Sequence, residues 1–398
     1  MTASPQTFDS PDAALRALAG RLSVADETEL GASCGRVLAA DVVADRDSPA
    51  ADVSAMDGFA VRRSDLTGRP MPIAGECAAG DAEKTLPPGS VLKVFTGGVV
   101  PIGADAVVKV EDATERAGRV RLPSEPAVAS GMHIRRRGEN VAAGSVVVPA
   151  GEILTPASMA TLANFGAVGS PVHRRVRVAV VTTGGEVVGV DDRPAAHQLR
   201  NSNAVSVAAV LESRMWAEVM STTHVADDPA TITATIRRGL ASADVIVLTG
   251  GVSMGDHDYV PRAVADAGGE VVFHRLPLRP GKPILGAVAD GKLILGLPGN
   301  PVSATVNARR MAVPLAAKVA GIADWLPPMP AVRLATPVDK PLPLWAMKLA
   351  RVGGDGRVEW IAGRGSGDLV ALGRSDGFIE VPPGGVGTGP MAWWPWNG

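Results

Sequence analysis

The sequence predicts a multidomain protein in which an α/β region with a mostly parallel sheet lies between two β-rich regions. Its 398 residues exceed one compact domain of roughly 100–200 residues. From about residue 176 to 319, valine-rich runs alternate with helical patterns, which is typical of βαβ units. On either side, short apolar runs are broken by glycine and proline, of which the chain has 46 and 32.

Composition and charge exclude several classes of protein. Hydrophobic residues make up 46%, enough for sizeable cores, so we do not expect disorder as the main state. A formal net charge of −2 argues against non-specific binding to nucleic acid or to an anionic membrane. Cys34 and Cys77 are too few for a cysteine zinc site or a disulfide framework, which fits the reducing cytoplasm. The N-terminal residues do not resemble a signal peptide, and no apolar run reaches about 18 residues, so we expect no membrane span.

The first expected element is a helix over residues 11–22. Ser10 is its N-cap, Pro11 occupies the first helical position, and Asp12 lies in the first turn, where an acidic residue is favoured. Its apolar residues recur at helical spacing: Ala14, Leu15, Leu18 and Leu22. From residue 29 to about 154, short β-type runs alternate with turn residues, so we expect a mostly β region without a long helix.

The α/β region is expected to contain four strands and three helices. The strands are predicted at residues 176–181, 219–225, 245–248 and 293–295. Two helices begin after the N-caps Asn201 and Asp228 and end near residues 213 and 242, and the third runs from 301 to about 319. After a proline-rich linker at 325–330, short strands predict a small β domain. Its three C-terminal tryptophans, Trp393, Trp394 and Trp396, are expected to cover a core or an interface.

Three glycine-rich loops follow strands of the α/β region, at residues 183–186, 250–258 and 296–301. In an open parallel sheet, loops at the carboxyl ends of the strands line one crevice, where backbone N–H groups can hold an anion. A single loop of this kind is as readily explained by a tight turn. Three of them favour a binding site. The dinucleotide and P-loop patterns are missing, which argues against a Rossmann dehydrogenase.

Charged residues on the same loops suggest how a ligand is held. The carboxylates are suited to Mg²⁺, although helix capping competes as the role of Asp228 and Asp258. They are Glu186, Asp227, Asp228, Asp256 and Asp258. Arg279 and Lys282 flank a Pro-Gly turn and could contact a phosphate or another oxyanion, the alternative being a solvated turn.

Histidine and serine chemistry receives less support. The six histidines show no zinc spacing. Residues 251–255, GVSMG, match the nucleophile elbow of α/β hydrolases. That mechanism needs an acid and a histidine well downstream of Ser253, and only His257 and His274 follow it. A hydrolase therefore stays a minor alternative.

Six motifs carry a family resemblance. They are SAMDGFAV at 54–61, FTGG at 95–98, IRRRGE at 134–139, TGGVS at 249–253, PGKP at 280–283 and GLPGNPVSA at 296–304. In this order they resemble the molybdopterin molybdenumtransferase family, represented by MoeA and the gephyrin E domain. The resemblance covers about residues 14–319 and continues more weakly to the end of the chain.

The resemblance implies a homodimer and a chain of four domains. An N-terminal domain would comprise residues 1–50 and 133–172, with a β-rich domain at 51–132 inserted into it, the two together being elongated. A three-layer α/β molybdopterin-binding domain would follow at 173–325, and a C-terminal β-barrel-like domain at 330–398.

The resemblance also implies a function in molybdenum cofactor biosynthesis. Molybdate would displace AMP from adenylated molybdopterin with the help of Mg²⁺, in the cytoplasm. A molybdopterin adenylyltransferase and recipient molybdoenzymes are the expected protein partners, whereas nucleic acid and membranes are not expected. The sequence leaves open whether the metal is molybdenum or tungsten, and which enzyme receives the cofactor.

Site residues are carried over from the same resemblance. Matching active-site positions are Asp57, Thr96, Glu186, Asp227 and Asp258, of which the last three would bind Mg²⁺. Matching binding positions are Gly250, Gly251, Ser253, Arg275, Arg279, Lys282, Pro298, Gly299 and Asn300. Because Asp57 and Thr96 belong to the β-rich region, the site would be completed across the dimer interface.

Three positions depart from the family pattern. Asn140 and Gly185 stand where the family has aspartates, and Met347 stands where it has an arginine. Asparagine keeps a carbonyl ligand but loses the charge, whereas glycine removes the carboxylate. An alternative function is therefore a diverged carrier that binds molybdopterin or its adenylate without efficient turnover.

Overall fold

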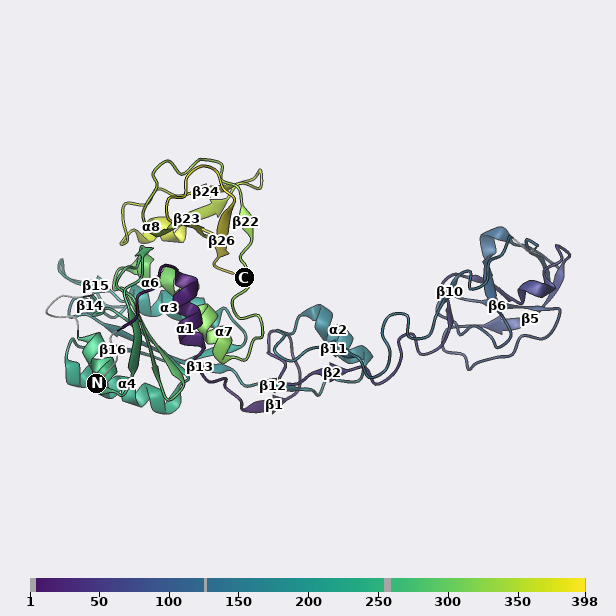
Figure 1. Ribbon diagram of the computed structural model, residues 1–398, viewed down its shortest axis with the longest axis horizontal. Coiled ribbons are helices and arrows are strands. Elements are labelled where there is room, and N and C mark those ends of the chain that lie inside the picture. Colours follow the sequence, from purple (N-terminus) through teal and green to yellow (C-terminus); the bar gives the residue numbers. More distant parts are fainter. Residues whose placement is uncertain (1–4, 125–126, 254–258, 398) are drawn as a thin grey trace. The chain divides into compact units, whose positions relative to one another are not determined.

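The computed structural model describes residues 5–124, 127–253 and 259–397 and divides the chain into two compact units (Figure 1). The first unit contains Met1–Ala40, Ala150–Met159 and Val168–Gly398, and the second contains Asp41–Pro149 and Ala160–Ala167. None of the described helices has both the length and the apolar character needed to cross a membrane. The predicted division into four domains stays a prediction.

A six-stranded sheet forms the centre of the first unit. Its strands lie in the order β16 (Ala217–Val225), β13 (Val176–Thr183), β17 (Val245–Thr249), β21 (Lys292–Leu297), β20 (Leu285–Ala289) and β18 (Glu270–His274). The first four strands are parallel, and β20 runs antiparallel to both of its neighbours. The four predicted strands are those four parallel ones, so the predicted mostly parallel sheet is confirmed.

Helices cover both faces of this sheet. On one face lie α1 (Pro11–Ala19), α3 (Ser202–Glu212), α6 (Pro301–Asn307) and α7 (Val313–Val319). On the other lie α4 (Pro229–Ser242) and α5 (Val260–Asp266). Strand β17 shows why both layers form, because its alternating side chains enter both cores: Val245 and Val247 face one layer, and Ile246 and Leu248 face the other. Burial of each such side chain stabilises the fold by about 1.5–3 kcal/mol.

Local side-chain hydrogen bonds start the predicted helices. The backbone N–H of Ala13 donates to Ser10 Oγ (3.2 Å), that of Ala204 to Asn201 Oδ1 (3.1 Å) and that of Thr231 to Asp228 Oδ2 (2.7 Å). These caps confirm the predicted start of each helix. Helix α1 ends at Ala19, three residues before its predicted end, because Gly20 takes the C-cap position.

The last predicted helix is interrupted by a π-helical turn, Ala308–Ala312, between α6 and α7. This turn carries Arg310, whose side chain is buried. Its guanidinium donates to Glu380 Oε1 (3.2 Å) and to Asp12 Oδ1 (2.6 Å), and it lies 4.4 Å from the centre of the Trp394 ring. A buried ionic network therefore joins the α/β layers to the C-terminal sheet.

The C-terminal sheet recruits one strand from the α/β region. Its order is β19 (Leu278–Arg279), β23 (Trp345–Val352), β25 (Gly377–Val381), β26 (Met391–Pro395) and β22 (Ala331–Val332), with β24 (Val358–Trp360) also paired to β23. Helix α8 (Leu369–Gly373) lies between β24 and β25 in the chain. Trp393 and Trp394 are buried, and Trp394 stacks on Phe378. These tryptophans form core, as predicted.

The second unit is β-rich. Its main sheet has the order β7 (Ala106–Lys109), β4 (Gly58–Val61), β6 (Val91–Val94), β5 (Met71–Cys77), β9 (Arg119–Arg121) and β8 (Thr114–Arg116). Two short ribbons pair β2 (Val42–Val43) with β11 (Val146–Val148), and β3 (Val53–Ser54) with β10 (Ile134–Arg135). Gly58 is required, because a Cβ there would lie 2.2 Å from the Val108 carbonyl oxygen.

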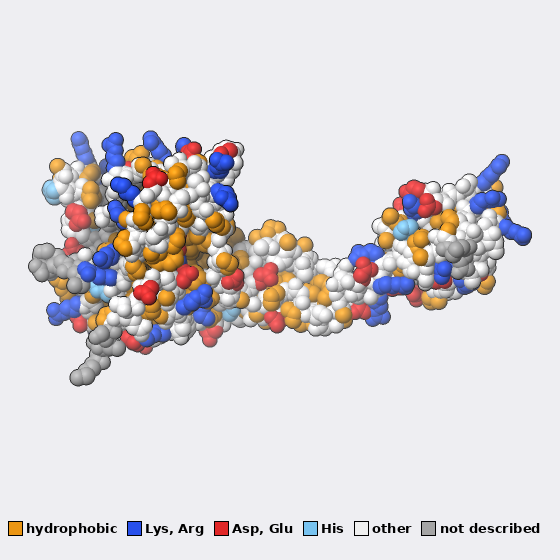
Figure 2. All heavy atoms as spheres, turned by 45° about the horizontal axis from the view of Figure 1, so that its top comes forward, with side chains coloured by type: hydrophobic (Ala, Val, Ile, Leu, Met, Phe, Trp, Pro, Cys, Tyr) orange, Lys and Arg blue, Asp and Glu red, His pale blue; other side chains and the backbone are white. Residues whose placement is uncertain are grey.

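The remaining elements are short. In the first unit, β1 (Thr28–Leu30) pairs with β12 (Pro171–His173), and β14 (Val187–Val188) pairs with β15 (Leu199–Arg200). Helix α2 (Pro156–Asn164) has residues in both units, and 3₁₀ turns form at Arg63–Asp65 and Val110–Asp112. Basic and acidic side chains are both scattered over the visible face (Figure 2), in agreement with the near-neutral charge balance.

Candidate active site

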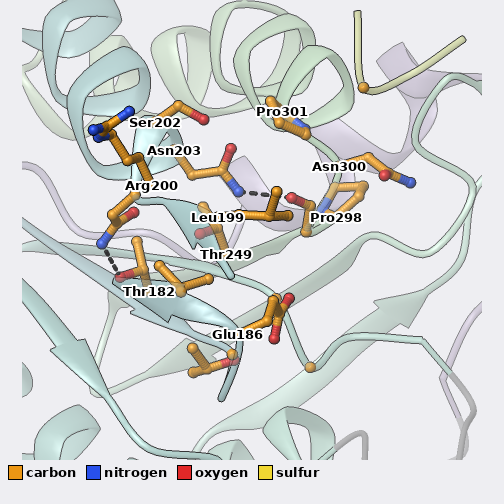
Figure 3. Close-up of a pocket in the computed structure, with 18 of the residues that line it drawn as sticks. Thr182, Glu186, Leu199, Arg200, Ser202, Asn203, Thr249, Pro298, Asn300 and Pro301 are labelled. Carbon is orange, nitrogen blue, oxygen red and sulfur yellow. Dashed lines mark hydrogen bonds between the residues drawn. The ribbon is translucent and has the colours of Figure 1, made fainter. Parts of the chain in front are cut away.

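Four parallel strands end at the same edge of the α/β sheet. Thr182 is in register with both His224 and Thr249, and Thr249 is in register with Leu297. The loops that follow these strands therefore come together, and they line a pocket of about 860 Å³ (Figure 3). We call it the polar pocket. Among the predicted site residues, those that line it are Glu186, Asp227, Gly250, Gly251, Ser253, Pro298, Gly299 and Asn300.

The glycine loop after β17 can form only without side chains. Gly250 and Gly251 have φ values of +91° and +61°, which favour glycine. A Cβ on Gly250 would lie 2.7 Å from the carbonyl oxygen of Thr183, and one on Gly251 would lie 3.1 Å from Val260 Cγ2. The two glycines thus serve the tight turn, and both line the polar pocket.

Amide and hydroxyl groups form one wall of the polar pocket. Asn203 Nδ2 donates to the Gly299 carbonyl oxygen (2.8 Å), which fixes the side chain against the loop that carries Pro298 (Figure 3). Its Oδ1 is buried and has no partner among the described residues, and the same holds for Thr183 Oγ1. Buried acceptors rarely stay unpaired, so each of these oxygens lacks a donor that the described residues do not supply. The sequence pattern indicated only a helix start at Asn201, so Asn203 was not predicted as a site residue.

Two carboxylates lie at the pocket, and a third predicted one has a structural role. The backbone N–H of Gly185 donates to Asp227 Oδ2 (2.9 Å), and Glu186 follows in the same loop. Hydrogen bonds from the Thr231 side chain and then its backbone lower the pKa of Asp228, as expected for a helix cap, so the structure gives no support to Asp228 as a metal ligand.

The metal-binding prediction rests partly on Asp258, which lies outside the described residues together with Asp256 and His257. Within the described part of the chain, no three His, Cys, Asp or Glu side chains are grouped to hold a metal ion. Even without Asp258, the carboxylates of Glu186 and Asp227 are suitable ligands for Mg²⁺, because this ion usually keeps several waters beside one or two carboxylates.

A second pocket, of about 770 Å³, adjoins the first and shares Pro283, Pro298 and Asn300 with it. We call it the cationic pocket, because Arg279, Lys282, Lys340 and Lys348 line it. The structure therefore places Arg279 and Lys282 in this second pocket, which only the third glycine-rich loop, at 296–301, also lines among the described residues. Lys340 and Lys348 were not predicted from the sequence.

An aromatic residue completes the cationic pocket. Lys348 Nζ lies 4.3 Å from the centre of the Trp360 ring, and the indole Nε1 of Trp360 is buried without a partner in the described chain. Burial, and then the nearby charge of Arg279, lower the pKa of Lys348 below its ordinary value of 10.5, against the opposing influence of Asp339. Met347 also lines this pocket, so the departure from the family pattern falls on its wall.

Arg275, a predicted binding residue, and His274, which the hydrolase alternative would need, have different surroundings. Arg275 has a φ of +81° and an exposed side chain, and it is not among the residues that line either pocket. His274 Nε2 contacts the Val252 carbonyl oxygen (2.7 Å), so this ring nitrogen is engaged with the backbone beside Ser253. That contact does not favour a Ser253 hydrolase that relies on His274.

The second unit holds the other predicted pair. Both the backbone N–H and the hydroxyl of Thr96 donate to Asp57 Oδ1, at 2.7 and 2.8 Å. These bonds, the backbone one first, lower the pKa of Asp57 and keep its carboxylate ionised. Asn140 Oδ1 accepts from the Arg135 guanidinium, and Asn140 Nδ2 donates to Ser48 Oγ (3.3 Å).

Comparison with known proteins gives consistent matches along the chain. Residues 10–166 match the model of the MoeA N-terminal region (domain I and II), and residues 179–318 match a probable molybdopterin binding domain. The molybdopterin molybdenumtransferase of Synechococcus elongatus is 35% identical over 365 residues, which is 88% of each chain. Molybdopterin molybdenumtransferase 2 of Mycobacterium tuberculosis is 39% identical over 288 residues, covering 69% of this chain and 70% of that one.

Solved structures agree on the fold. A molybdopterin biosynthesis MoeA protein from Pyrococcus horikoshii superposes with a TM-score of 0.81 at 24% identity and covers 97% of this chain and 99% of its own. A second structure from that organism gives a TM-score of 0.77 at 25% identity and covers 99% of this chain. With the curated relatives above, these matches confirm the family resemblance. The chain belongs to the molybdopterin molybdenumtransferase family.

Proposed function

We propose that this protein catalyses molybdenum insertion in molybdenum cofactor biosynthesis, exchanging the AMP of adenylated molybdopterin for molybdate in a Mg²⁺-dependent reaction. The observation that carries the proposal is the shared wall between two pockets of different chemistry, formed by Pro283, Pro298 and Asn300. Two substrates that must react with each other would then be bound side by side. Such positioning supplies a large part of many enzymatic rate enhancements.

The polar pocket is suited to adenylated molybdopterin. The buried oxygens of Asn203 and Thr183 would accept hydrogen bonds from the N–H groups of a pterin ring. The Gly250–Gly251 loop lines the pocket, and its backbone N–H groups would contact a phosphate. Glu186 and Asp227 would hold Mg²⁺, with Asp258 as the third predicted ligand, and the bound ion would offset the negative charge of the phosphate.

The cationic pocket is suited to molybdate. Arg279 offers a planar set of donors, and Lys282 and Lys348 offer point charges, so together they would attract a tetrahedral dianion. The oxyanion would then be bound beside the shared wall, close to the dithiolene sulfurs that become ligands of the metal in place of its oxygens. In this arrangement the protein positions both reactants and stabilises their charges.

A direct assay tests the proposal. Purified protein is mixed with adenylated molybdopterin, Mg²⁺ and molybdate or tungstate, and AMP is measured. We expect AMP release that needs both the oxyanion and Mg²⁺. Binding of adenylated molybdopterin without AMP release would contradict the proposal and support a carrier instead. The carrier alternative is favoured by Gly185, which leaves the loop one carboxylate short of the family pattern.

The family resemblance also implies a homodimer in which Asp57 and Thr96 of one copy serve the site of the other, and we retain this as a proposal. Light scattering at micromolar concentration, carried out on the active protein, tests it. A monomer that releases AMP at the full rate would contradict a shared site.

A further inference from the structure

The cationic turn, residues 279–283, determines where two charges of the cationic pocket lie. Arg279 and Lys282 are exposed at its two sides, and both line that pocket. Long, flexible side chains hold a charge in one place only when their backbone is fixed. The positions of both charges therefore depend on what fixes the backbone between Arg279 and Lys282.

Asn307 supplies a fully buried contact to this turn. Its side chain has 0% exposure, and its Nδ2 donates to the carbonyl oxygens of Pro280 (3.2 Å) and Ser303 (2.8 Å). Asn307 Oδ1 is buried without a partner in the described chain. An amide buried with one acceptor unpaired costs stability, so its presence is not explained by packing alone.

Gly281 shows how closely the turn lies against Asn307. Its φ is +110°, and a Cβ built on it would lie 2.1 Å from Asn307 Nδ2 and 2.9 Å from Asn307 Oδ1. No side chain can occupy that space while Asn307 keeps its position. The backbone of the turn therefore rests directly on the Asn307 amide.

Helix α6 connects this contact to the shared wall. Asn300, which lines both pockets, precedes the helix as its N-cap residue, and Asn307 is the last residue of the helix. The π-helical turn Ala308–Ala312 follows immediately. One short helix therefore touches the wall between the pockets at one end and the cationic turn at the other.

We propose that Asn307 is a positioning residue for the oxyanion: its amide fixes the cationic turn so that Arg279 and Lys282 present their charges to molybdate. This inference rests on the proposed function for the identity of the ligand. It assigns Asn307 no contact with substrate. Its loss is expected to weaken oxyanion binding while leaving binding in the polar pocket unchanged.

The first test compares Asn307→Ala with Thr305→Ala. Thr305 lies on the same helix and is also buried, but its hydroxyl bonds to Ser206 and Pro301 and not to the turn. We expect Asn307→Ala to raise the Kd for molybdate, measured by calorimetry without molybdopterin, and the molybdate KM by about five- to tenfold. The KM for adenylated molybdopterin should change less than about twofold, and Thr305→Ala should change neither constant. Equal changes in both KM values would overturn the proposal, because they indicate a general structural defect.

The second test uses a double-mutant cycle and does not depend on activity. Backbone N–H groups of Leu276 and Ile284 donate to the Lys282 carbonyl oxygen (3.2 and 3.1 Å), so their hydrogen exchange reports on the turn. Gly281→Ala should speed this exchange, and so should Asn307→Ala. Gly281→Ala should speed the exchange less in the Asn307→Ala background than in the wild-type background, because the steric conflict with the Asn307 side chain is then absent. Additive effects, or unchanged exchange in Asn307→Ala, would refute the contact as the element that fixes the turn.

Measuring molybdate binding and AMP release separately distinguishes this inference from the proposed function. Molybdate binding that is sensitive to Asn307, in a protein that releases no AMP, would support the positioning role and reject the transferase proposal. AMP release with unchanged molybdate affinity in Asn307→Ala would do the reverse.

Discussion

The polar pocket and the cationic pocket share a wall, yet they offer a ligand different chemistry. The polar pocket is lined by two carboxylates, by Arg200 and by amide and hydroxyl side chains, whereas the cationic pocket is lined by Arg279 and three lysines and, among the described residues, by no carboxylate. Without a carboxylate beside them, the four cations of the cationic pocket are available to an anionic substrate. This predicts that substitutions on either side of the wall affect one substrate only.

The largest expected effect tests the cationic side. Lys282→Ala should lower kcat/KM for molybdate by about 10- to 100-fold, since it removes a charge-assisted contact to a dianion. The KM for adenylated molybdopterin should stay within about twofold of the wild-type value. Steady-state kinetics with each substrate varied in turn measure both constants, and Lys318→Ala on α7 serves as a control for the loss of a lysine elsewhere. A matching loss for both substrates would mean that the two pockets do not act separately.

The polar side is tested by Asn203→Ala. Loss of the buried Oδ1 acceptor should raise the KM for adenylated molybdopterin by about five- to tenfold without changing the Kd for molybdate. Ser206→Ala, one turn further along α3, is the matched control and should leave both values unchanged. If Asn203→Ala weakens molybdate binding instead, the assignment of the two pockets is reversed.

A pH titration sharpens the comparison further. Because the pKa of Lys348 lies below 10.5, this residue loses its charge at a lower pH than an ordinary lysine. Molybdate affinity should therefore fall by about threefold as the pH rises through that lowered pKa, whereas no lysine lines the polar pocket among the described residues. Lys348→Arg stays charged and should remove this step. Calorimetry of wild type and variant at matched pH measures the difference, and identical pH profiles would exclude Lys348 from oxyanion binding.

The smallest expected effect concerns the missing carboxylate of the polar pocket. A Cβ on Gly185 would meet no atom within 4 Å, and the backbone there does not require glycine. Gly185→Asp should fold normally and lower the Mg²⁺ concentration for half-maximal AMP release by about threefold, because it adds a charge beside Glu186. The same charge should slightly weaken molybdate binding. A Mg²⁺ titration of AMP release decides this, and an unchanged midpoint would place position 185 away from the metal.

Much of the fold could be predicted because its signals are local. Helix starts at Ser10, Asn201 and Asp228 depend on a side chain and a backbone N–H three residues later. Three of the four parallel strands, β13, β17 and β21, are largely continuous apolar runs, as expected for strands buried on both faces, whereas the edge strand β16 is mostly exposed or half-buried. The antiparallel strands β18 and β20 were missed because short apolar runs outside a βαβ alternation do not indicate their pairing.

Only those residues of the candidate site that lie in loops directly after the parallel strands could be predicted from the sequence. Glu186, Gly250 and Asn300 come together because parallel strands end at one edge of the sheet. Lys348 and Trp360 reach the cationic pocket for another reason, because β19 joins the C-terminal sheet through β23. This pairing connects residues more than sixty positions apart, and no local pattern reports it. Asn203 was missed because its distinguishing property, an unpaired buried oxygen, exists only in three dimensions.

The Arg310 network has a consequence for how the first unit unfolds. If the C-terminal sheet detached alone, Arg310 would lose both the Glu380 carboxylate and the Trp394 ring that it packs against, and removing one partner of a buried ion pair costs about 3–5 kcal/mol. Partial opening at this junction is therefore a costly intermediate. The sheet and the α/β layers should melt in a single cooperative transition, in which protease sites in either part become accessible at the same denaturant concentration.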